Sequence, residues 1–383
     1  MLKLLTIIGA RPQIIKSAAI SRAIRNHFSN AVREVVVHTG QHYDERMSGI
    51  FFEELGIPQP HYNLGVGSGK HGAQTGQMIT GIEAVLEQEK PDFLIIYGDT
   101  NSTLAAAIAA AKMQVPIVHI EAGLRSFNKV MPEEVNRIMS DHVSTYLFPP
   151  TETGYTNLQN EGFKLQNLPP YTIDNPGVFN VGDVMYDNTL FFSKYARQKT
   201  DIREKYGLGK GEFLLTTLHR NTNTDDARRL NAIFRALHKI SLAKAMTMVI
   251  PLHPRTLKQM ELLLEPDLLQ QIRSNAQLLL LPPVSFLEMI QLETQARLIL
   301  TDSGGVQKEA YFLSKPCIIM RAETEWVEIV ENGAALLCDA DEDRIYAGCL
   351  FYLDRQPAGI FKNSYGDGNA AEKILQILLE NSF

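Results

Sequence analysis

Residues 297–310, with the sequence RLILTDSGGVQKEA, contain a short apolar run, a polar break with two glycines, and the start of a helix-like segment. This order is typical of a buried strand that ends where a helix begins, as in a parallel α/β sheet. Glycines let the backbone approach an anion closely, and the N-terminus of a helix offers free N–H donors. Ser303, Gly304 and Gly305 therefore predict a seat for a diphosphate, and Glu309 could accept hydrogen bonds from two ribose hydroxyls. The alternative is a simple helix cap with glycines in a tight turn.

The same strand-then-helix pattern recurs in both halves of the chain. Short apolar, β-branched runs occupy residues 4–8, 34–38, 93–97, 117–120, 145–148 and 178–181, and then 213–218, 247–252, 278–281, 298–301, 317–320 and 335–338. Amphipathic stretches separate these runs, which favours parallel sheets built from strand–helix–strand units. We expect an α/β protein with two Rossmann-like, doubly wound parallel sheets in tandem.

A chain of 383 residues exceeds what one hydrophobic core usually serves, which favours two domains. Residues 165–177 are rich in Asn and Pro and suit an exposed connection. We therefore predict one domain over residues 1–177 and a second, which binds the nucleotide, over residues 178–367. The segment 368–383 has apolar residues at helical spacing and predicts a final helix that docks on a neighbouring surface. The glycine-rich residues 65–76 predict a mobile loop.

The composition argues against several classes of partner. The formal net charge is −6 and no stretch clusters Lys and Arg, so we expect no nucleic-acid partner. Cys317, Cys338 and Cys349 form no C-x-x-C pair, and we expect them to be reduced thiols. No run approaches the roughly 18 apolar residues that a membrane-spanning helix needs. We expect a cytoplasmic protein without a membrane partner.

Charged residues gather where the predicted strands of the first half end, which is the edge at which open α/β sheets bind ligands. The cations Arg11 and Lys16 follow the first strand, where they suit a phosphate or a leaving anion. The carboxylates Asp99, Glu121 and Glu133 stand at or near the ends of neighbouring strands. Like charges in one crevice raise some pKa values into a range that is useful for proton transfer. The alternatives are a solvated basic helix start for Lys16 and solvated or core positions for the carboxylates.

The first predicted strand-to-helix turn indicates whether the chain could bind a dinucleotide cofactor. Gly9-Ala10-Arg11-Pro12 lacks the G-x-G-x-x-G pattern of dinucleotide-binding folds, so we expect no NAD. A metal site could be assembled from Asp99, Glu121 and His119. However, His119 lies two residues before Glu121, inside the strand, and does not reach its end. We therefore expect no metal requirement.

Further candidates follow other predicted strands. His219 and Arg220 follow a strand of the second half, and His253 follows the next one, so they should face the diphosphate seat. Histidines that hold loops in place are the alternative. Gln41 and His42 follow the second strand of the first half, and we include them among the candidates for substrate contacts.

Several motifs together resemble a known family. They are GARPQIIK at 9–16, GDTNST at 98–103, HIEAGLRS at 119–126, PEEVNR at 132–137, HR at 219–220, TDSGGVQKE at 301–309 and YGDG at 365–368. They occur in order over nearly the whole chain. On these residues the chain resembles the non-hydrolysing UDP-N-acetylglucosamine 2-epimerases.

The resemblance implies a glycosyltransferase-B-like pair of domains, with the active site in the interdomain cleft and the last helix returning to the N-terminal domain. It implies an isomerase that acts on a UDP-amino sugar for surface polysaccharide synthesis, by loss of UDP, a 2-acetamidoglucal intermediate and re-addition of UDP. It also implies a homodimer. We therefore predict catalytic roles for Asp99, Glu121, Glu133, His219 and Lys16, and UDP or substrate contacts from Arg11, Gln41, His42, Arg137, Arg220, His253, Ser303, Gly304, Gly305, Glu309 and Arg321.

The chain departs from the common family pattern in places. The stretch 126–131 is shorter than usual, and Trp326 follows Glu325 where an Arg is usual. These features resemble the branch that acts on UDP-2,3-diacetamido-2,3-dideoxyglucuronic acid, which is the alternative substrate. A glycosyltransferase or a hydrolysing epimerase on the same fold, and a catalytically silent nucleotide-sugar-binding regulator, are the other functional alternatives.

Overall fold

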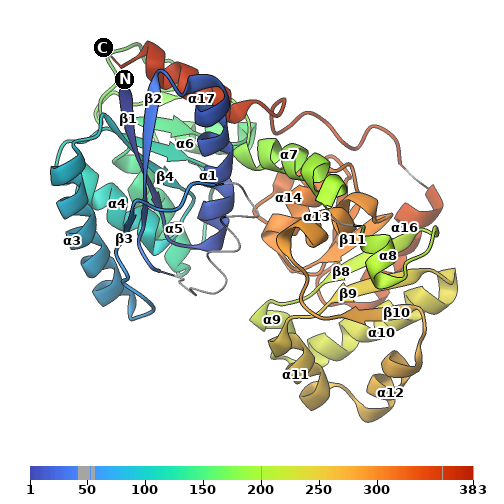
Figure 1. The fold of residues 1–383 in the computed structure, drawn as a ribbon. Coiled ribbons are helices and arrows are strands. Elements are labelled where there is room, and N and C mark those ends of the chain that lie inside the picture. The colour runs from blue at the N-terminus through green and yellow to red at the C-terminus, as the bar shows by residue number, and fades with distance from the viewer. Residues whose placement is uncertain (42–51, 53–56, 200, 356, 383) are drawn as a thin grey trace. The chain divides into compact units, whose positions relative to one another are not determined.

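The computed structural model describes residues 1–41, 52, 57–199, 201–355 and 357–382. The chain divides into two compact units. Unit 1 comprises Met1–Asn188 together with Asn363–Phe383, and unit 2 comprises Thr189–Lys362. Each unit is built on one parallel sheet (Figure 1). The predicted α/β class with two doubly wound parallel sheets is confirmed.

Unit 1 contains a seven-stranded sheet in the order β3-β2-β1-β4-β5-β6-β7. Its strands are β1 (Leu2–Ile8), β2 (Val32–His38), β3 (Tyr62–Asn63), β4 (Phe93–Tyr97), β5 (Ile117–Ile120), β6 (Tyr146–Phe148) and β7 (Gly177–Val178). Every neighbouring pair runs parallel. The strand order reverses its direction between β1 and β4, and a ligand crevice forms at such a switch point in open α/β sheets.

Helices cover both faces of this sheet. They are α1 (Arg11–Ala23), the π-helical turn η1 (Ile24–Phe28), α3 (His71–Glu89), α4 (Asn101–Lys112), α5 (Pro132–His142), α6 (Glu152–Asn160) and α17 (Ala370–Glu380). Helices α3, α4 and α5 pack side by side, and α17, close to the C-terminus, lies beside α1 (Figure 1). The final helix is therefore part of unit 1.

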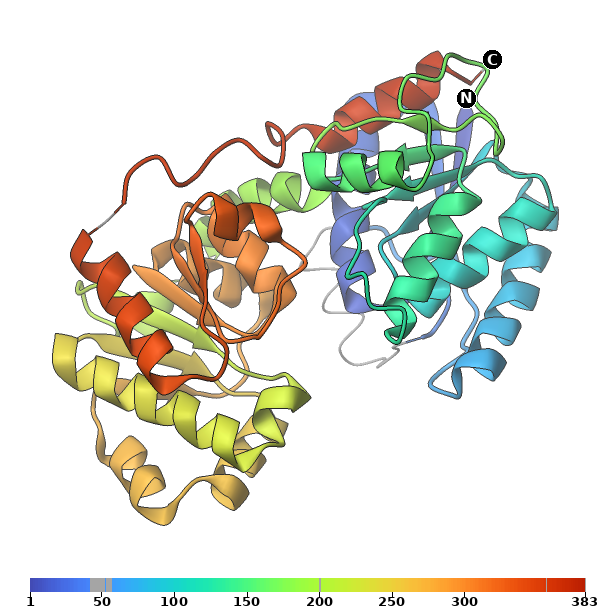
Figure 2. The same cartoon turned by 180° about the vertical axis from the view of Figure 1, so that it is seen from behind.

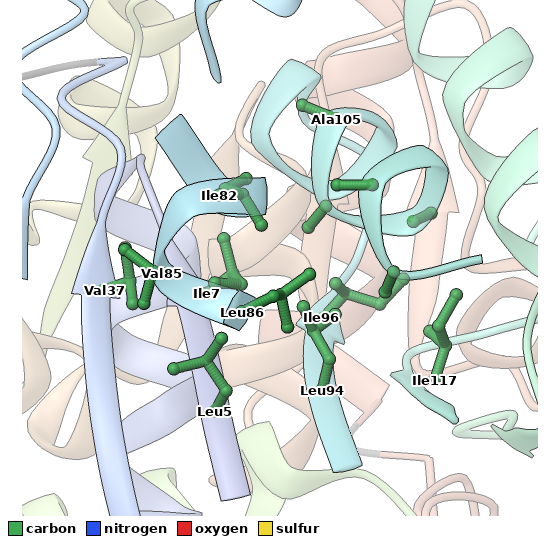
Figure 3. Packing of buried hydrophobic residues seen from close by; sticks show 14 of the residues in the cluster. Leu5, Ile7, Val37, Ile82, Val85, Leu86, Leu94, Ile96, Ala105 and Ile117 are labelled. Atoms are coloured by element: carbon green, nitrogen blue, oxygen red, sulfur yellow. The ribbon is translucent and has the colours of Figure 1, made fainter. Parts of the chain in front are cut away.

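One hydrophobic core of unit 1 lies between the sheet and helices α3 and α4. Figure 3 shows Leu5 and Ile7 of β1 and Ile96 of β4 directed toward Ile82 of α3. The face of α4 that joins this core consists of alanines, which allow the helix to approach the sheet closely. Burial of each large apolar side chain stabilises the fold by roughly 1.5–3 kcal/mol.

Helix α3 begins at His71, so the mobile loop predicted for residues 65–76 is wrong in its second half. Gly72 and Gly76 lie inside the helix. Each glycine costs about 1 kcal/mol relative to alanine in a helix. The apolar face of α3, which starts at Met78, is buried in the core and outweighs that cost.

Unit 2 contains a six-stranded parallel sheet in the order β10-β9-β8-β11-β12-β13. Its strands are β8 (Phe213–Thr217), β9 (Thr247–Pro251), β10 (Leu278–Leu281), β11 (Leu298–Thr301), β12 (Cys317–Ile319) and β13 (Ala335–Leu337). Its helices are α8 (Ile202–Tyr206), α9 (Asn221–Thr224), α10 (Ala227–Lys244), α11 (Pro254–Leu263), α12 (Pro266–Ser274), α13 (Phe286–Gln295), α14 (Gly304–Phe312), α15 (Val327–Glu331) and α16 (Glu342–Arg355). Helices α10 and α16 lie side by side (Figure 2), and the switch point lies between β8 and β11.

Unit 1 extends beyond residue 177, where the sequence suggested a boundary, and ends within helix α7 (Val184–Lys199). The first part of α7 bonds to helix α1. Asn188 donates a hydrogen bond of 2.6 Å to the carbonyl of Ile15 and accepts one of 3.1 Å from Arg22. These bonds attach the start of α7 to unit 1, which composition alone could not reveal.

All three cysteines are free, as the sequence predicts, and the structure shows that all three are buried. Within the described ranges, we find no helix with the length and apolar character that crossing a membrane requires.

Candidate active site

The switch point of unit 1 is closed by Gln13, a buried residue in the first turn of α1. Its side-chain oxygen accepts hydrogen bonds from the backbone N–H groups of Gly9 and Ala10, at 2.9 and 3.2 Å. Its amide nitrogen donates to the carbonyl of Tyr97 and to the hydroxyl of Thr103. Gln13 thus joins the carboxyl ends of β1 and β4. Gln13 belongs to the motif at 9–16, but the sequence alone indicates no role for it.

The turn after β1 packs against the start of α4 with no spare room. A Cβ added at Gly9 would lie 2.1 Å from Oγ of Ser102 and 2.2 Å from Oγ1 of Thr39. Gln41 accepts hydrogen bonds from the backbone N–H and the hydroxyl of Ser102. Gln41, predicted to contact substrate, is therefore buried at this edge and fixed by α4.

Lys16 and Glu121 form an ion pair at the carboxyl ends of β1 and β5. The Nζ of Lys16 lies 2.6 Å from Oε1 of Glu121, and both side chains are largely buried. A Cβ at Gly98 would lie 3.0 Å from Nζ of Lys16 and 3.3 Å from Oε1 of Glu121. Gly98 has a φ of 61° and Glu121 a φ of 72°, in the left-handed region that non-glycine residues seldom adopt. A strained carboxylate at a switch point is typical of a functional site.

Asp99 lies beside this pair. Its Oδ2 is 2.5 Å from Nη2 of Arg137, and its backbone carbonyl accepts a hydrogen bond from Asn136. Burial raises the pKa of Asp99 above its ordinary value and nearby Glu121 raises it further, although the charges of Arg137 and Lys16 oppose this. The side chain keeps 28% of its surface exposed and so remains accessible to a substrate.

Glu133 does not join Asp99 and Glu121 in this structure. It lies exposed in the first turn of α5, and the described residues make no hydrogen bond or ion pair with it. The adjacent Glu134 is buried instead and accepts hydrogen bonds from the N–H groups of Ser126 and Phe127. Burial alone would raise the pKa of Glu134, but these hydrogen bonds and that of Arg137 lower it below its ordinary value.

His119 supports the same edge from inside the sheet. Its Nδ1 lies 2.7 Å from Oδ1 of Asp141 and its Nε2 lies 2.9 Å from the carbonyl oxygen of Gly98. Asp141 also pairs with Arg125 at 2.7 Å. Both ring nitrogens of His119 are engaged, so this side chain is not free to ligate a metal. In the part of the chain that the structure describes, no three His, Cys, Asp or Glu residues are grouped as a metal site would require.

In unit 2, the buried carboxylate of Asp302 joins the ends of β8 and β11. It accepts hydrogen bonds from the backbone N–H groups of His219 and Arg220 and from the amide of Asn223. The ring of His219 lies beside it, with Nδ1 3.4 Å from Oδ1, and keeps 52% of its surface exposed. Asp302 therefore orients His219 and Arg220 at the switch point.

The predicted diphosphate seat forms the N-terminus of α14. Ser303 caps the helix, and its hydroxyl accepts from the N–H of Val306. A Cβ at Gly304 would lie 3.2 Å from Oε1 of Glu325 and 3.7 Å from Nη1 of Arg321, and these two side chains pair at 2.9 Å. The free N–H groups, the positive end of the helix dipole and the guanidinium of Arg321 together suit an anion.

Three further residues were predicted to contact UDP or the substrate, namely His253, Arg11 and His42. The exposed ring of His253 caps α11 by accepting from the N–H of Arg255, as in the alternative of a loop-holding histidine. Arg11 is exposed at the start of α1. His42 lies outside the described residues.

The profile of the family described as UDP-N-acetylglucosamine 2-epimerase matches residues 24–379. The chain belongs to this epimerase family. It is 46% identical to a UDP-2,3-diacetamido-2,3-dideoxy-D-glucuronate 2-epimerase of Pseudomonas aeruginosa, with 98% of this chain and 99% of the relative covered. It is 46% identical, with the same coverage, to a UDP-N-acetylglucosamine 2-epimerase homolog of Methanococcus maripaludis.

Solved structures of epimerases share the fold. The crystal structure of the UDP-GlcNAc 2-epimerase of Methanocaldococcus jannaschii in complex with UDP-GlcNAc and UDP aligns with a TM-score of 0.83 and 40% identity. The alignment covers 99% of this chain and 100% of that chain. A UDP-GlcNAc 2-epimerase of Neisseria meningitidis bound to UDP-GlcNAc aligns with a TM-score of 0.83 and 29% identity. The predicted resemblance to the epimerase family is confirmed.

Proposed function

We propose that this epimerase interconverts UDP-N-acetylglucosamine and UDP-N-acetylmannosamine by eliminating UDP and adding it back. The observation that carries the proposal is the pairing of two carboxylates, Asp99 and Glu121, with two cations, Arg137 and Lys16, at the switch point of one sheet. The reaction also requires a site that binds UDP after it has left the sugar, and the diphosphate seat at α14 supplies it. Unit 1 would supply the acid and the base, and the N-terminus of α14 would bind the diphosphate of UDP.

The chemistry follows from the position of the C2 hydrogen, which is not adjacent to a carbonyl and is hard to remove alone. In the proposed step, a carboxylate takes the C2 proton while the bond between C1 and the UDP oxygen breaks. The electrons of the C–H bond form the C1–C2 double bond, and UDP leaves with the electrons of the C–O bond. Return of a proton to the opposite face of C2 and re-addition of UDP at C1 give the epimer. Water must be excluded meanwhile, because it would trap the intermediate.

The two carboxylates suit different protonation states. Burial raises the pKa of Asp99, so its side chain can hold and deliver a proton nearer neutral pH than an ordinary aspartate. The ion pair with Lys16 stabilises the ionised form of Glu121, which suits a base. His219, oriented by Asp302, would protonate or hydrogen-bond the departing diphosphate. Glu133 would act only where the bound sugar reaches the start of α5.

A specific observation favours a second substrate. The Pseudomonas aeruginosa relative is named for UDP-2,3-diacetamido-2,3-dideoxy-D-glucuronate and is as similar to this chain as the homolog named for UDP-N-acetylglucosamine. The same elimination and re-addition would serve both sugars, because the reacting atoms are the same. The further groups on the second sugar are an acetamido group at C3 and a carboxylate at C6.

We further propose that the enzyme needs neither NAD nor a metal, acts as a homodimer in the cytoplasm, and supplies a precursor for surface polysaccharide. The chemistry supports the first part, since elimination requires proton transfer but no hydride acceptor.

Incubation of the pure protein with each UDP-sugar in deuterium oxide, followed by proton NMR, tests the proposal. We expect solvent deuterium at C2 of both epimers and recovery of intact UDP-sugar. Inversion with the original hydrogen kept at C2 would contradict the elimination step. Accumulation of free UDP with free sugar would indicate a hydrolysing epimerase, and transfer to an added acceptor would indicate a glycosyltransferase. The sugar that equilibrates faster at equal concentration identifies the substrate.

A further inference from the structure

A carboxyl group that the proposed mechanism does not use lies behind the diphosphate seat. Glu293, near the end of α13, is 0% exposed. Within the described part of the chain, neither of its oxygens receives a hydrogen bond from a donor. Its interacting neighbour is another carboxyl group, that of Glu309 on the adjacent helix α14.

Such a site is costly for an ionised carboxylate, because burial without a donor or a cation removes its solvation. Burial raises the pKa of Glu293 well above its ordinary value, and the charge and hydrogen bond of Glu309 raise it further. Two contacting carboxyl groups are stable when they share one proton. Glu309 is 9% exposed and lies nearer to solvent, so the more buried Glu293 carries that proton.

We propose that Glu293 is a positioning residue for the nucleotide: its protonated carboxyl donates a hydrogen bond to Glu309 and holds that carboxylate toward the ribose of UDP. This rests on the proposed function and on the sequence-based expectation that Glu309 accepts hydrogen bonds from two ribose hydroxyls. In this arrangement the proton of Glu293 engages one oxygen of Glu309, and the other oxygen would accept from the ribose. A purely apolar residue at 293 would fill the same space but would leave Glu309 without this bond.

Packing of α13 does not explain why a glutamate occupies the buried position 293. Ile290 and Leu292 are buried and supply the apolar contacts expected of a helix packed on a sheet. A buried carboxyl among them that receives no hydrogen bond from a donor contributes less to stability than a third apolar side chain would. The contact with Glu309 therefore accounts for the carboxyl group of Glu293 better than packing does.

Two substitutions separate the hydrogen bond from the volume of the side chain. Glu293→Gln keeps the shape and offers an N–H donor to Glu309, whereas Glu293→Met keeps the approximate volume without a donor. The dissociation constants of UDP and of 2′-deoxy-UDP are measured by calorimetry on each full-length protein. We expect the wild type and Glu293→Gln to prefer UDP, and Glu293→Met to bind UDP about tenfold more weakly, with most of its preference over 2′-deoxy-UDP lost.

Thr294→Val is the matched control on the same helix, because among the described residues its hydroxyl bonds to the carbonyl of Ile290 and to no other group. We expect the control to keep the preference for UDP even if its melting temperature falls. An infrared difference spectrum should contain the carbonyl stretch of a protonated carboxyl that Glu293→Gln lacks.

Glu309→Ala, measured in parallel, separates the two hypotheses. If Glu309→Ala still prefers UDP over 2′-deoxy-UDP, the proposed ribose contact itself is wrong. If Glu309→Ala loses the preference while Glu293→Met keeps it, the positioning role of Glu293 is overturned. An equal loss in Glu293→Gln and Glu293→Met would also overturn it, because the amide should restore the hydrogen bond.

Discussion

Asp99 and Glu121 carry the first prediction at the scale of single residues. Asp99→Asn and Glu121→Gln should each lower the turnover number by roughly 10²–10⁴, the usual contribution of one acid or base. Binding of UDP should persist, because the nucleotide contacts we propose come from unit 2. Turnover is measured by NMR and UDP binding by calorimetry. Glu87→Gln, an exposed change on α3, is the control, and unchanged turnover in either active-site variant would remove that residue from the mechanism.

Gly9 carries a prediction about packing at the switch point. Gly9→Ala places a methyl group 2.1 Å from Oγ of Ser102 and 2.2 Å from Oγ1 of Thr39, so the turn after β1 must shift. We expect a loss of about 1–3 kcal/mol in the free energy of unfolding, measured in urea. Gly72→Ala on α3 is the matched control, because nothing lies within 4 Å of the added Cβ. It should stabilise the protein by up to about 1 kcal/mol. Equal effects of the two changes would refute the steric explanation.

The sequence placed candidate residues at the correct edge of each sheet, because strand ends are marked by a change from apolar to polar residues. It could not tell which of them meet. The pairing of Asp99 with Arg137 depends on how α5 packs, and so does the burial of Glu134 in place of Glu133. Glu293 gave no signal, since its importance comes only from contact between two helices.

At the scale of elements, the sequence predicted long or strongly apolar segments well and missed weak ones. All six predicted strands of unit 2 are present, because each is a run of apolar residues bounded by polar ones. The strand β3 has two residues and no periodicity, so nothing in the sequence indicated it. The sequence did not indicate the start of α3, because glycines such as Gly72 and Gly76 destabilise a helix. Packing in the core, rather than the local sequence, offsets this loss of stability.

Asp187 connects two elements that are distant in the chain, and its titration leads to a prediction. Its carboxylate, on α7, accepts hydrogen bonds from the N–H groups of Ala370 and Ala371 at the start of α17. Burial, the largest effect, raises the pKa of Asp187 from 3.8 to about 6. Because the folded state holds this proton more tightly than the unfolded state, the contribution of Asp187 to stability is greatest below pH 3.8 and is lost as the pH rises through about 6.

Asp187→Asn cannot titrate and isolates this effect. Between about pH 7 and about pH 4, the wild type should gain roughly 2–3 kcal/mol of unfolding free energy relative to Asp187→Asn, measured by urea unfolding at each pH. Asp174→Asn, at an exposed position, should show no such trend. A difference between wild type and Asp187→Asn that does not vary with pH would mean that Asp187 titrates as an ordinary aspartate.

At the scale of the whole molecule, the number and class of the units followed from length and from the repeated strand pattern. The crossing between them did not, because helix α7 continues through it and the residues before Thr189 bond to α1. A boundary inside a continuous helix leaves no break in composition for the sequence to reveal. The docking of α17 on unit 1 likewise depends on side chains that are distant in the sequence, such as Asp187, which lies 183 residues before Ala370.

The proposed chemistry predicts how the whole enzyme responds to loss of small ligands. After dialysis against a strong chelator and treatment with charcoal, turnover should stay within about twofold of its initial value, because neither Lewis-acid nor hydride chemistry is required. The N-terminus of α14, Arg220 and Arg321 would stabilise the negative charge of the departing UDP. Asp99 and Glu121 would transfer the C2 proton. Turnover is followed by NMR with added magnesium, zinc or NAD in separate samples. Recovery of a lost activity by any one of these additions would show that the residues named here are not sufficient for the reaction.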